Sequence, residues 1–162
     1  MFLASEHNIQ YSLNATSFAS TPCENGFLLV ENHYAKTLDL PGAATDRVGL
    51  VACVEKMYDE SDMSLGNFRL NINEFLPRIY RFKVGDMFDT NNFKYDDGDY
   101  ANYAAIAAAI ATPTTVYAYP STNGQIELEP IQNAGAAVEL QATRTVTMAG
   151  GESGLVFVCT KA

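Results

Sequence analysis

Apolar and polar residues alternate most regularly near the end of the chain. Between residues 138 and 148 the even positions are mostly apolar, whereas the odd positions, beginning with Glu139, are polar. This period of two predicts a strand with one buried face, and Glu139 falls on its polar face. Residues 149–154 supply glycines for a turn, and the apolar run 155–159 predicts a returning strand that is buried on both faces. The chain therefore contains a β-hairpin with one strand in the core.

The same reasoning predicts strands elsewhere in the chain. Apolar runs at 27–30 and 48–54 indicate buried strands, and strict alternation indicates amphipathic ones at 68–72 and 78–84. In the strand 78–84, we expect Tyr80, Phe82 and Val84 on one face and Arg81 and Lys83 on the other. A second hairpin is predicted from 115–119 and 125–129, which flank an Asn-Gly turn; its inward residues are Ile126 and Leu128.

Three segments lack this regularity. Residues 56–67 are rich in acidic residues and indicate a solvated loop or a short helix. Residues 86–103 form a polar stretch interrupted by aromatic residues, and we expect a loop there. The alanine-rich segment 101–111 predicts a short helix with Asp99 as its N-cap, ended by Thr112 and Pro113.

Together these elements predict a mainly β fold, an antiparallel β-sandwich or barrel-like domain with one short helix. Residues 1–25 show little periodicity apart from Ile9, Tyr11 and Leu13, and are interpreted as an extended N-terminal arm with one edge strand. Residues 26–162 form the β domain. A division into two β lobes near residues 85–92 is compatible with the pattern, although nothing in the sequence requires it.

Composition narrows the classes of partner. With a net charge of −9, the chain is a poor match for nucleic acid. The longest apolar run, 104–111, is too short for a membrane span, and no signal-peptide pattern begins the chain, so synthesis in the cytoplasm and no membrane partner are expected. Three widely spaced cysteines, Cys23, Cys53 and Cys159, fit small core residues in a reducing compartment.

Candidate catalytic groups are few. The two histidines, His7 and His33, lie in the least regular third of the chain. A Cys23 nucleophile with His33 as its base is conceivable, but neither residue has a recognisable local signature, and a structural role is favoured for both. No glycine-rich phosphate-binding motif or G-x-S-x-G motif occurs, and no cofactor is expected.

The acidic segment 86–99 contains the side chains best suited to a hard cation. Its candidate ligands are Asp96, Asp97 and Asp99, because carboxylate oxygens suit calcium. The spacing does not match an EF-hand loop, so a solvated loop is the favoured interpretation and a metal site the alternative.

Two groups of residues are candidates for contacts with other proteins. Arg144 interrupts an otherwise apolar strand face; it either extends to water at the rim of the sheet or pairs with a carboxylate of a neighbouring subunit. Four aromatic residues of the 86–103 segment belong either to a small satellite core or to a contact surface. They are Phe93, Tyr95, Tyr100 and Tyr103.

The segment FKVGD at 82–86, the segment DTNN at 89–92 and the closing hairpin through GGESG at 150–154 resemble the decoration, or cement, proteins of tailed-bacteriophage heads. The resemblance implies a non-enzymatic virion protein that binds the outer capsid surface and stabilises it by bridging major capsid subunits, often as a homotrimer. No catalytic residues carry over, because the family has none. An arm at 1–25, with Ile9, Tyr11 and Leu13, would order on a neighbouring subunit.

Two alternatives stay open. The first is a β-rich binding module of a head fibre or tail, with a protein or carbohydrate ligand; the absence of tryptophan disfavours the carbohydrate. The second is a small metal-dependent enzyme built on Asp96, Asp97 or Asp99.

Overall fold

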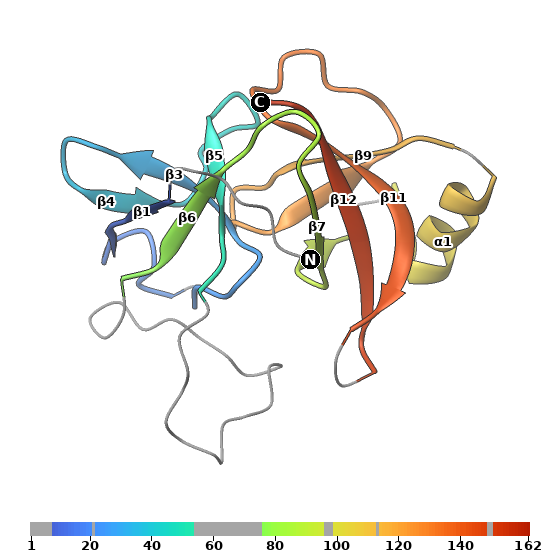
Figure 1. Cartoon of the computed structure of the whole chain (residues 1–162), viewed down its shortest axis with the longest axis horizontal. Helices are drawn as coiled ribbons and strands as arrows, with labels where there is room; N and C mark the ends of the chain where they lie inside the picture. Colours follow the sequence, from blue (N-terminus) through green and yellow to red (C-terminus); the bar gives the residue numbers. More distant parts are fainter. Residues whose placement is uncertain (1–7, 21, 54–75, 96–98, 113, 149–150) are drawn as a thin grey trace.

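The computed structural model describes residues 8–20, 22–53, 76–95, 99–112, 114–148 and 151–162. These residues form two six-stranded β-sheets and one short helix (Figure 1). The mainly β, sandwich-like or barrel-like fold predicted from the sequence is confirmed. The loop or helix expected at 56–67 and the strand expected at 68–72 lie outside the described residues.

The first sheet is built from the N-terminal half, with strand order β1-β6-β5-β3-β4-β2. Its strands are β1 (Asn8–Gln10), β2 (Ser12–Leu13), β3 (Leu28–Asn32), β4 (Thr37–Asp39), β5 (Val48–Val51) and β6 (Arg78–Arg81). Strand β5 lies between β3 and β6 and is antiparallel to both.

The second sheet is built from the C-terminal half, with strand order β7-β12-β11-β9-β10-β8. Its strands are β7 (Met87–Thr90), β8 (Phe93–Lys94), β9 (Val116–Pro120), β10 (Ile126–Glu129), β11 (Glu139–Thr147) and β12 (Ser153–Lys161). Helix α1 (Tyr103–Ala111) packs against β11 and β9. No helix in the described ranges is long and apolar enough to cross a bilayer.

Both predicted hairpins are confirmed. β11 pairs with β12, and β9 pairs with β10 in antiparallel register. Ile126 and Leu128 are buried as expected. The sheets are mixed rather than purely antiparallel, because β2 runs parallel to β4 and β8 runs parallel to β10.

The main core lies between the two sheets. Leu28, Val48 and Leu50 of the first sheet belong to the same buried cluster as Leu140 and Phe157 of the second. The chain passes from one sheet to the other at residues 82–86, close to the expected lobe boundary at 85–92. Because this core draws on both sheets, neither sheet buries its apolar face without the other.

A second core covers the opposite face of the first sheet. It contains Leu29, Val51 and Ile79 from the strands, together with Leu13 and Phe18 from the N-terminal segment. The described part of the expected arm, from residue 8 onward, is therefore integrated into the sheet and its core. The physical reason is that β3 and β5 carry apolar residues on both faces, so the second face must also be covered.

Three predicted elements differ from the structure. The segment 86–103 is not simply a loop, because it contains β7, which pairs with β12, and β8. Phe88 and Thr90 of β7 point inward while Met87 and Asp89 are exposed, so a strand-like alternation is present over four residues only.

Strand β6 ends at Arg81, earlier than expected, and Val84 is 69% exposed in the following turn. The fully buried residue of this strand is Ile79. Helix α1 is capped by Asn102, whose side chain accepts a hydrogen bond from the Ala105 N–H, rather than by Asp99. The cap lies next to the first helical residue, as capping geometry requires.

The packing of the N-terminal segment predicts the effect of Phe18→Ala. Because Phe18 is only 4% exposed, its truncation should lower the free energy of unfolding by about 3–5 kcal/mol. The measurement is urea unfolding, with the exposed neighbour Thr16→Ala as the control. Equal stability of both variants would mean that residues 8–25 do not belong to the folded core.

Candidate functional site

Three charged residues lie on one face of the first sheet. In the strand register, Val30 pairs with Val48 and Gly49 pairs with Arg81. Side chains alternate along a strand, so Glu31, Arg47 and Arg81 share the face that carries Gly49. Further along the same strands this face becomes the second core.

An ion pair spans the central strand of this sheet. The Nε of Arg81 on β6 donates to Glu31 Oε1 at 2.9 Å, and Nη2 donates to Oε2 at 2.7 Å. Between β6 and β3 lies β5, where Gly49 presents no side chain. The Glu31 side chain is only 9% exposed, whereas that of Arg81 is 45% exposed. The hydrogen bonds that Arg81 donates to Glu31 are the main reason why the Arg81 pKa is raised.

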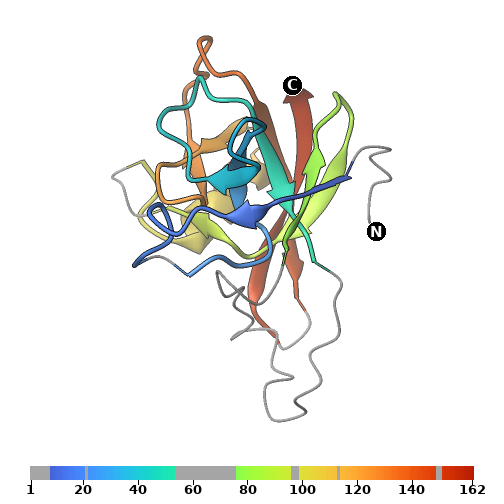
Figure 2. The same cartoon turned by 90° about the vertical axis from the view of Figure 1, so that its left-hand side faces the viewer.

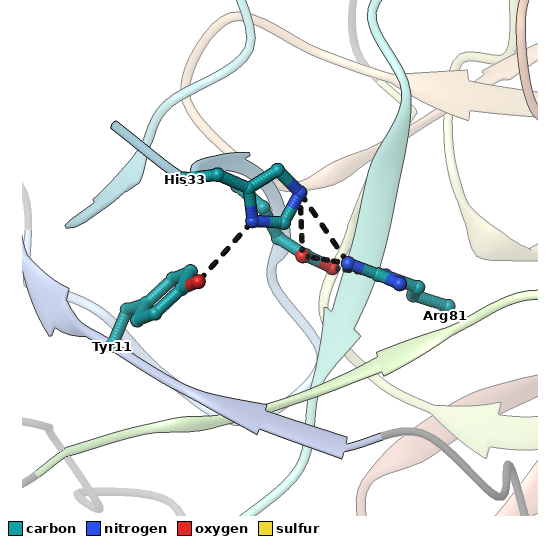
Figure 3. Close-up of polar contacts among 4 residues, drawn as sticks. Tyr11, His33 and Arg81 are labelled. Atoms are coloured by element: carbon teal, nitrogen blue, oxygen red, sulfur yellow. Dashed lines mark hydrogen bonds and ion pairs between the residues drawn. The ribbon is translucent and has the colours of Figure 1, made fainter. Parts of the chain in front are cut away.

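His33 extends this pair to Tyr11 (Figure 3). Its Nδ1 lies 3.2 Å from the Tyr11 hydroxyl, and its Nε2 lies 3.4 Å from Arg81 Nη2 and 3.5 Å from Glu31 Oε2. Arginine only donates, so the Arg81 contact makes Nε2 an acceptor, and a neutral ring then donates from Nδ1 to Tyr11. A protonated ring would instead donate from Nε2 to Glu31, in competition with Arg81.

A pocket of about 350 Å³ opens beside this group. Its polar wall consists of Glu31, His33, Arg47 and Arg81. The remaining lining is largely apolar and consists of Val48, Phe82, Val138 and Ala162. Within the described ranges, the Arg47 side chain makes no hydrogen bond or ion pair, and it lines the pocket.

The pocket lies at one end of the molecule, which we call the loop end. It comprises the β4–β5 loop at 40–47, the connection at 82–86, the β10–β11 loop at 130–138 and the last residues of β12. Figures 1 and 2 both show these segments at the same end. Backbone hydrogen bonds join them, from Ala137 N to Ala44 O at 3.0 Å and from Gly85 N to Cys159 O at 2.8 Å.

Glu139 fixes the β10–β11 loop to the second sheet. Contrary to the expected polar face, Glu139 is buried, and its carboxylate accepts hydrogen bonds from Thr160 Oγ1 at 2.7 Å and Gln132 Nε2 at 2.8 Å. Burial alone would raise the pKa of Glu139, but hydrogen bonds from Thr160, Gln132 and Gln141 and the charge of Lys161 bring it below its ordinary value.

The structure places Arg144 on the exposed part of β11. Between Ala142 and Arg144 the register of β11 against β12 shifts, and the pairing of β11 with β9 ends at Ala142. No described group forms an ion pair or hydrogen bond with the Arg144 side chain. Exposure of this kind fits both interpretations drawn from the sequence, the solvated rim and the subunit contact.

The N-terminal interface candidates are not equivalent. Ile9 lies in β1, at the edge of the first sheet, where it pairs with Ile79. Tyr11 packs against the second core and reaches His33. Leu13 is buried in that core, so in the isolated chain it offers no exposed surface.

The four aromatic candidates also differ in burial. Phe93 and Tyr100 are buried in the main core. Tyr103 is half-buried, and its hydroxyl donates to Gly154 O at 2.8 Å. Tyr95 is the most exposed of the four. Most of this group therefore supports the fold rather than a continuous contact surface.

The metal and thiol candidates can be placed only in part. Asp96 and Asp97 lie outside the described residues, and Asp99 is exposed. Among the residues that the structure describes, no group of three or more His, Cys, Asp or Glu side chains is arranged to hold a metal ion.

The three cysteines are buried, as predicted for core residues, and none of them forms a disulfide. Burial raises the pKa of Cys159 to about 11 and that of Cys23 further still. A buried thiol with a raised pKa is a poor nucleophile, and the hydrogen bonds of His33 lead to Tyr11 and Arg81 rather than to Cys23.

Sequence reasoning missed the cluster of Glu31, Arg47 and Arg81. The available signals were weak: Glu31 directly follows an apolar run, and Arg81 lies on the polar face of a predicted strand. Glu31 and Arg81 come together only because β5 lies between their strands, and a single sequence does not specify that order.

Comparison with known proteins adds no relative to this picture. No protein-family model, curated protein or solved structure matches the chain.

The Glu139 network predicts a pH-dependent stability difference. A lowered pKa means that the native state favours the carboxylate, so this stabilisation is present above the ordinary pKa of 4.5 and is lost as the pH falls through the native pKa. Glu139→Gln should lower the free energy of unfolding at pH 7 by about 1–3 kcal/mol, and the difference from wild type should narrow below about pH 4.5. Urea unfolding at pH 7 and pH 3.5 measures both effects.

The exposed residue Asp89 provides the control, because Asp89→Asn removes one negative charge without disturbing a buried network. If the Glu139→Gln difference were the same at both pH values, its hydrogen bonds would not depend on the carboxylate charge.

Proposed function

We propose that this chain is a non-enzymatic virion structural protein, a decoration protein that binds the outside of an assembled capsid and bridges major capsid subunits. The observation that best supports the proposal is the presence of exposed candidate contact residues toward both ends of one continuous β structure. Bridging two partners requires two separate surfaces, held at a fixed distance.

The first surface is the loop end. It exposes two large apolar side chains, Val84 at 69% and Ile131 at 75%. Both lie on segments that hydrogen bonds hold to the second sheet: Gly85 donates to Cys159 of β12, and Gln132 donates to Glu139 of β11. Apolar side chains on a firmly held surface favour binding, because little conformational entropy is lost when a partner covers them.

The second surface is the outer part of the β11–β12 hairpin. Strand β12 ends at the loop end and β11 is antiparallel to it, so the pair Thr147–Ser153 lies at the far end of the two strands from the loop end (Figure 1). Beyond Ala142, β11 exposes Thr143, Arg144 and Thr145 in succession. Arginine is enriched at protein interfaces, and Arg144 has no partner among the described residues.

The strands between the two surfaces provide the rigidity of a bridge. Leu155, Val156 and Phe157 of β12 are all buried, which fixes the hairpin to the main core. The net charge of −9 agrees with a position outside the shell, away from packaged nucleic acid. We further propose assembly as a homotrimer, with the hairpin surface contacting a neighbouring copy or the shell.

The first test is sedimentation of a lysate of cells that make the chain from its native gene. A decoration protein should migrate with large particles, at a copy number comparable to that of the shell protein, as measured by mass spectrometry of gradient fractions. A chain that stays near the top of the gradient as a small species would refute the proposal.

Variants of the loop end sharpen this test. Ile131→Ser combined with Val84→Ser should reduce the amount bound to particles at least fivefold, because both side chains are exposed and neither supports the core. Leu76→Ser is the matched control, since Leu76 is 51% exposed and lies two residues before β6, away from the loop end. An equal loss with the control would show that the loop end is not the contact surface.

Arg144→Ala tests the hairpin surface. It should weaken assembly by about fivefold, equivalent to about 1 kcal/mol, while the melting of the isolated chain stays cooperative and unchanged. Thr145→Ala is the neighbouring control. Loss of cooperative melting in Arg144→Ala would assign this residue a structural role instead.

A further inference from the structure

We infer that the loop-end pocket binds a carboxylate attached to a small apolar group. The pocket lies on the same loop end as the first proposed capsid contact, but its lining does not include Val84 or Ile131, and its binding can be tested on the isolated chain.

The charge of the polar wall favours an anion. The Glu31 carboxylate is paired with Arg81. It accepts two hydrogen bonds, which Nε and Nη2 of the Arg81 guanidinium donate. Arg47 lines the same pocket and has no partner among the described residues. One positive charge is therefore left uncompensated by these three side chains, in a chain whose net charge is −9.

The arginine geometry favours a carboxylate in particular. A guanidinium presents two parallel N–H groups that match the two oxygens of a carboxylate. Glu31 holds Arg81 in a fixed orientation, and Arg81 Nη1 donates to no described group. Arg47 can thus bind the ligand directly, while Nη1 of Arg81 supplies a second, preoriented donor on the same sheet face.

The rest of the pocket defines what the carboxylate is attached to. Val48, Phe82 and Val138 form an apolar lining, and a volume of about 350 Å³ is at the low end for small-molecule pockets. A phosphate dianion is disfavoured, because the nearby Glu31 carboxylate would repel its two negative charges more strongly than the single charge of a carboxylate, and the apolar lining would remain uncovered. A short aliphatic acid, or the chain end of a peptide with an apolar last residue, satisfies both parts of the pocket.

The test is calorimetric titration of the isolated full chain with three probes. They are a tripeptide that ends in valine with a free carboxylate, the same peptide as its C-terminal amide, and the free acid isovalerate. We expect saturable binding of at least one carboxylate probe, with a Kd of about 1 mM or lower, and no binding of the amide. Binding of the peptide alone would identify a chain end as the ligand, and comparable binding of isovalerate would identify a free acid.

Variants assign the binding to the pocket. Arg47→Gln should weaken binding at least tenfold, whereas Arg144→Gln, which removes the same charge from an exposed site on β11, should leave the Kd unchanged. Urea unfolding of each variant checks that the fold is intact. The inference is overturned if no carboxylate probe binds saturably, if the amide binds equally well, or if Arg47→Gln binds as wild type does.

Discussion

The structure depends on the need of two neighbouring strands, β3 and β5, to bury both of their faces. Leu28 and Leu50 point toward the second sheet, whereas Leu29 and Val51 point the other way. A single partner sheet covers only one of these faces. The N-terminal segment therefore has to cover the other, and Leu13, Phe18 and Cys23 do so as buried residues. The result is a layered molecule in which the first sheet lies between the second sheet and its own N-terminal segment.

The charged cluster follows from the same arrangement. The face that is apolar at Leu29, Val51 and Ile79 continues toward the loop end as Glu31, Arg47 and Arg81. Here the sheet reaches its rim, where the arginine heads contact water while the Glu31 carboxylate is nearly buried. A nearly buried carboxylate is costly without a partner, so the fold requires Arg81, and Gly49 leaves the path across β5 open. Loops joined by backbone hydrogen bonds then border the open pocket beside it.

Much of the fold was predictable where local pattern and burial agree. The 138–148 strand, both C-terminal hairpins, the alanine-rich helix and the buried cysteines follow from period, turn residues and residue size. The pattern failed where long-range pairing determines the structure. Strand β7 is a four-residue alternation beside an acidic segment, and only its pairing with β12 makes it a strand. Glu139 occupies a polar position in the pattern, yet partners from Thr160 and Gln132 allow its burial. The Glu31–Arg81 pair joins residues 50 positions apart and depends on strand order, which one sequence does not reveal.

Strand β12 also determines when the molecule can fold. It lies inside the second sheet, between β7 and β11, and its Phe157 is fully buried in the main core. In the first sheet, β1 pairs with β6, so Asn8 meets Tyr80. Contacts between distant parts of a chain slow folding, because the intervening loop must close before the contact stabilises it. During synthesis, the early strands therefore expose their apolar residues until 153–161 have emerged from the ribosome, and the main core then closes late, in a step that joins both halves of the chain.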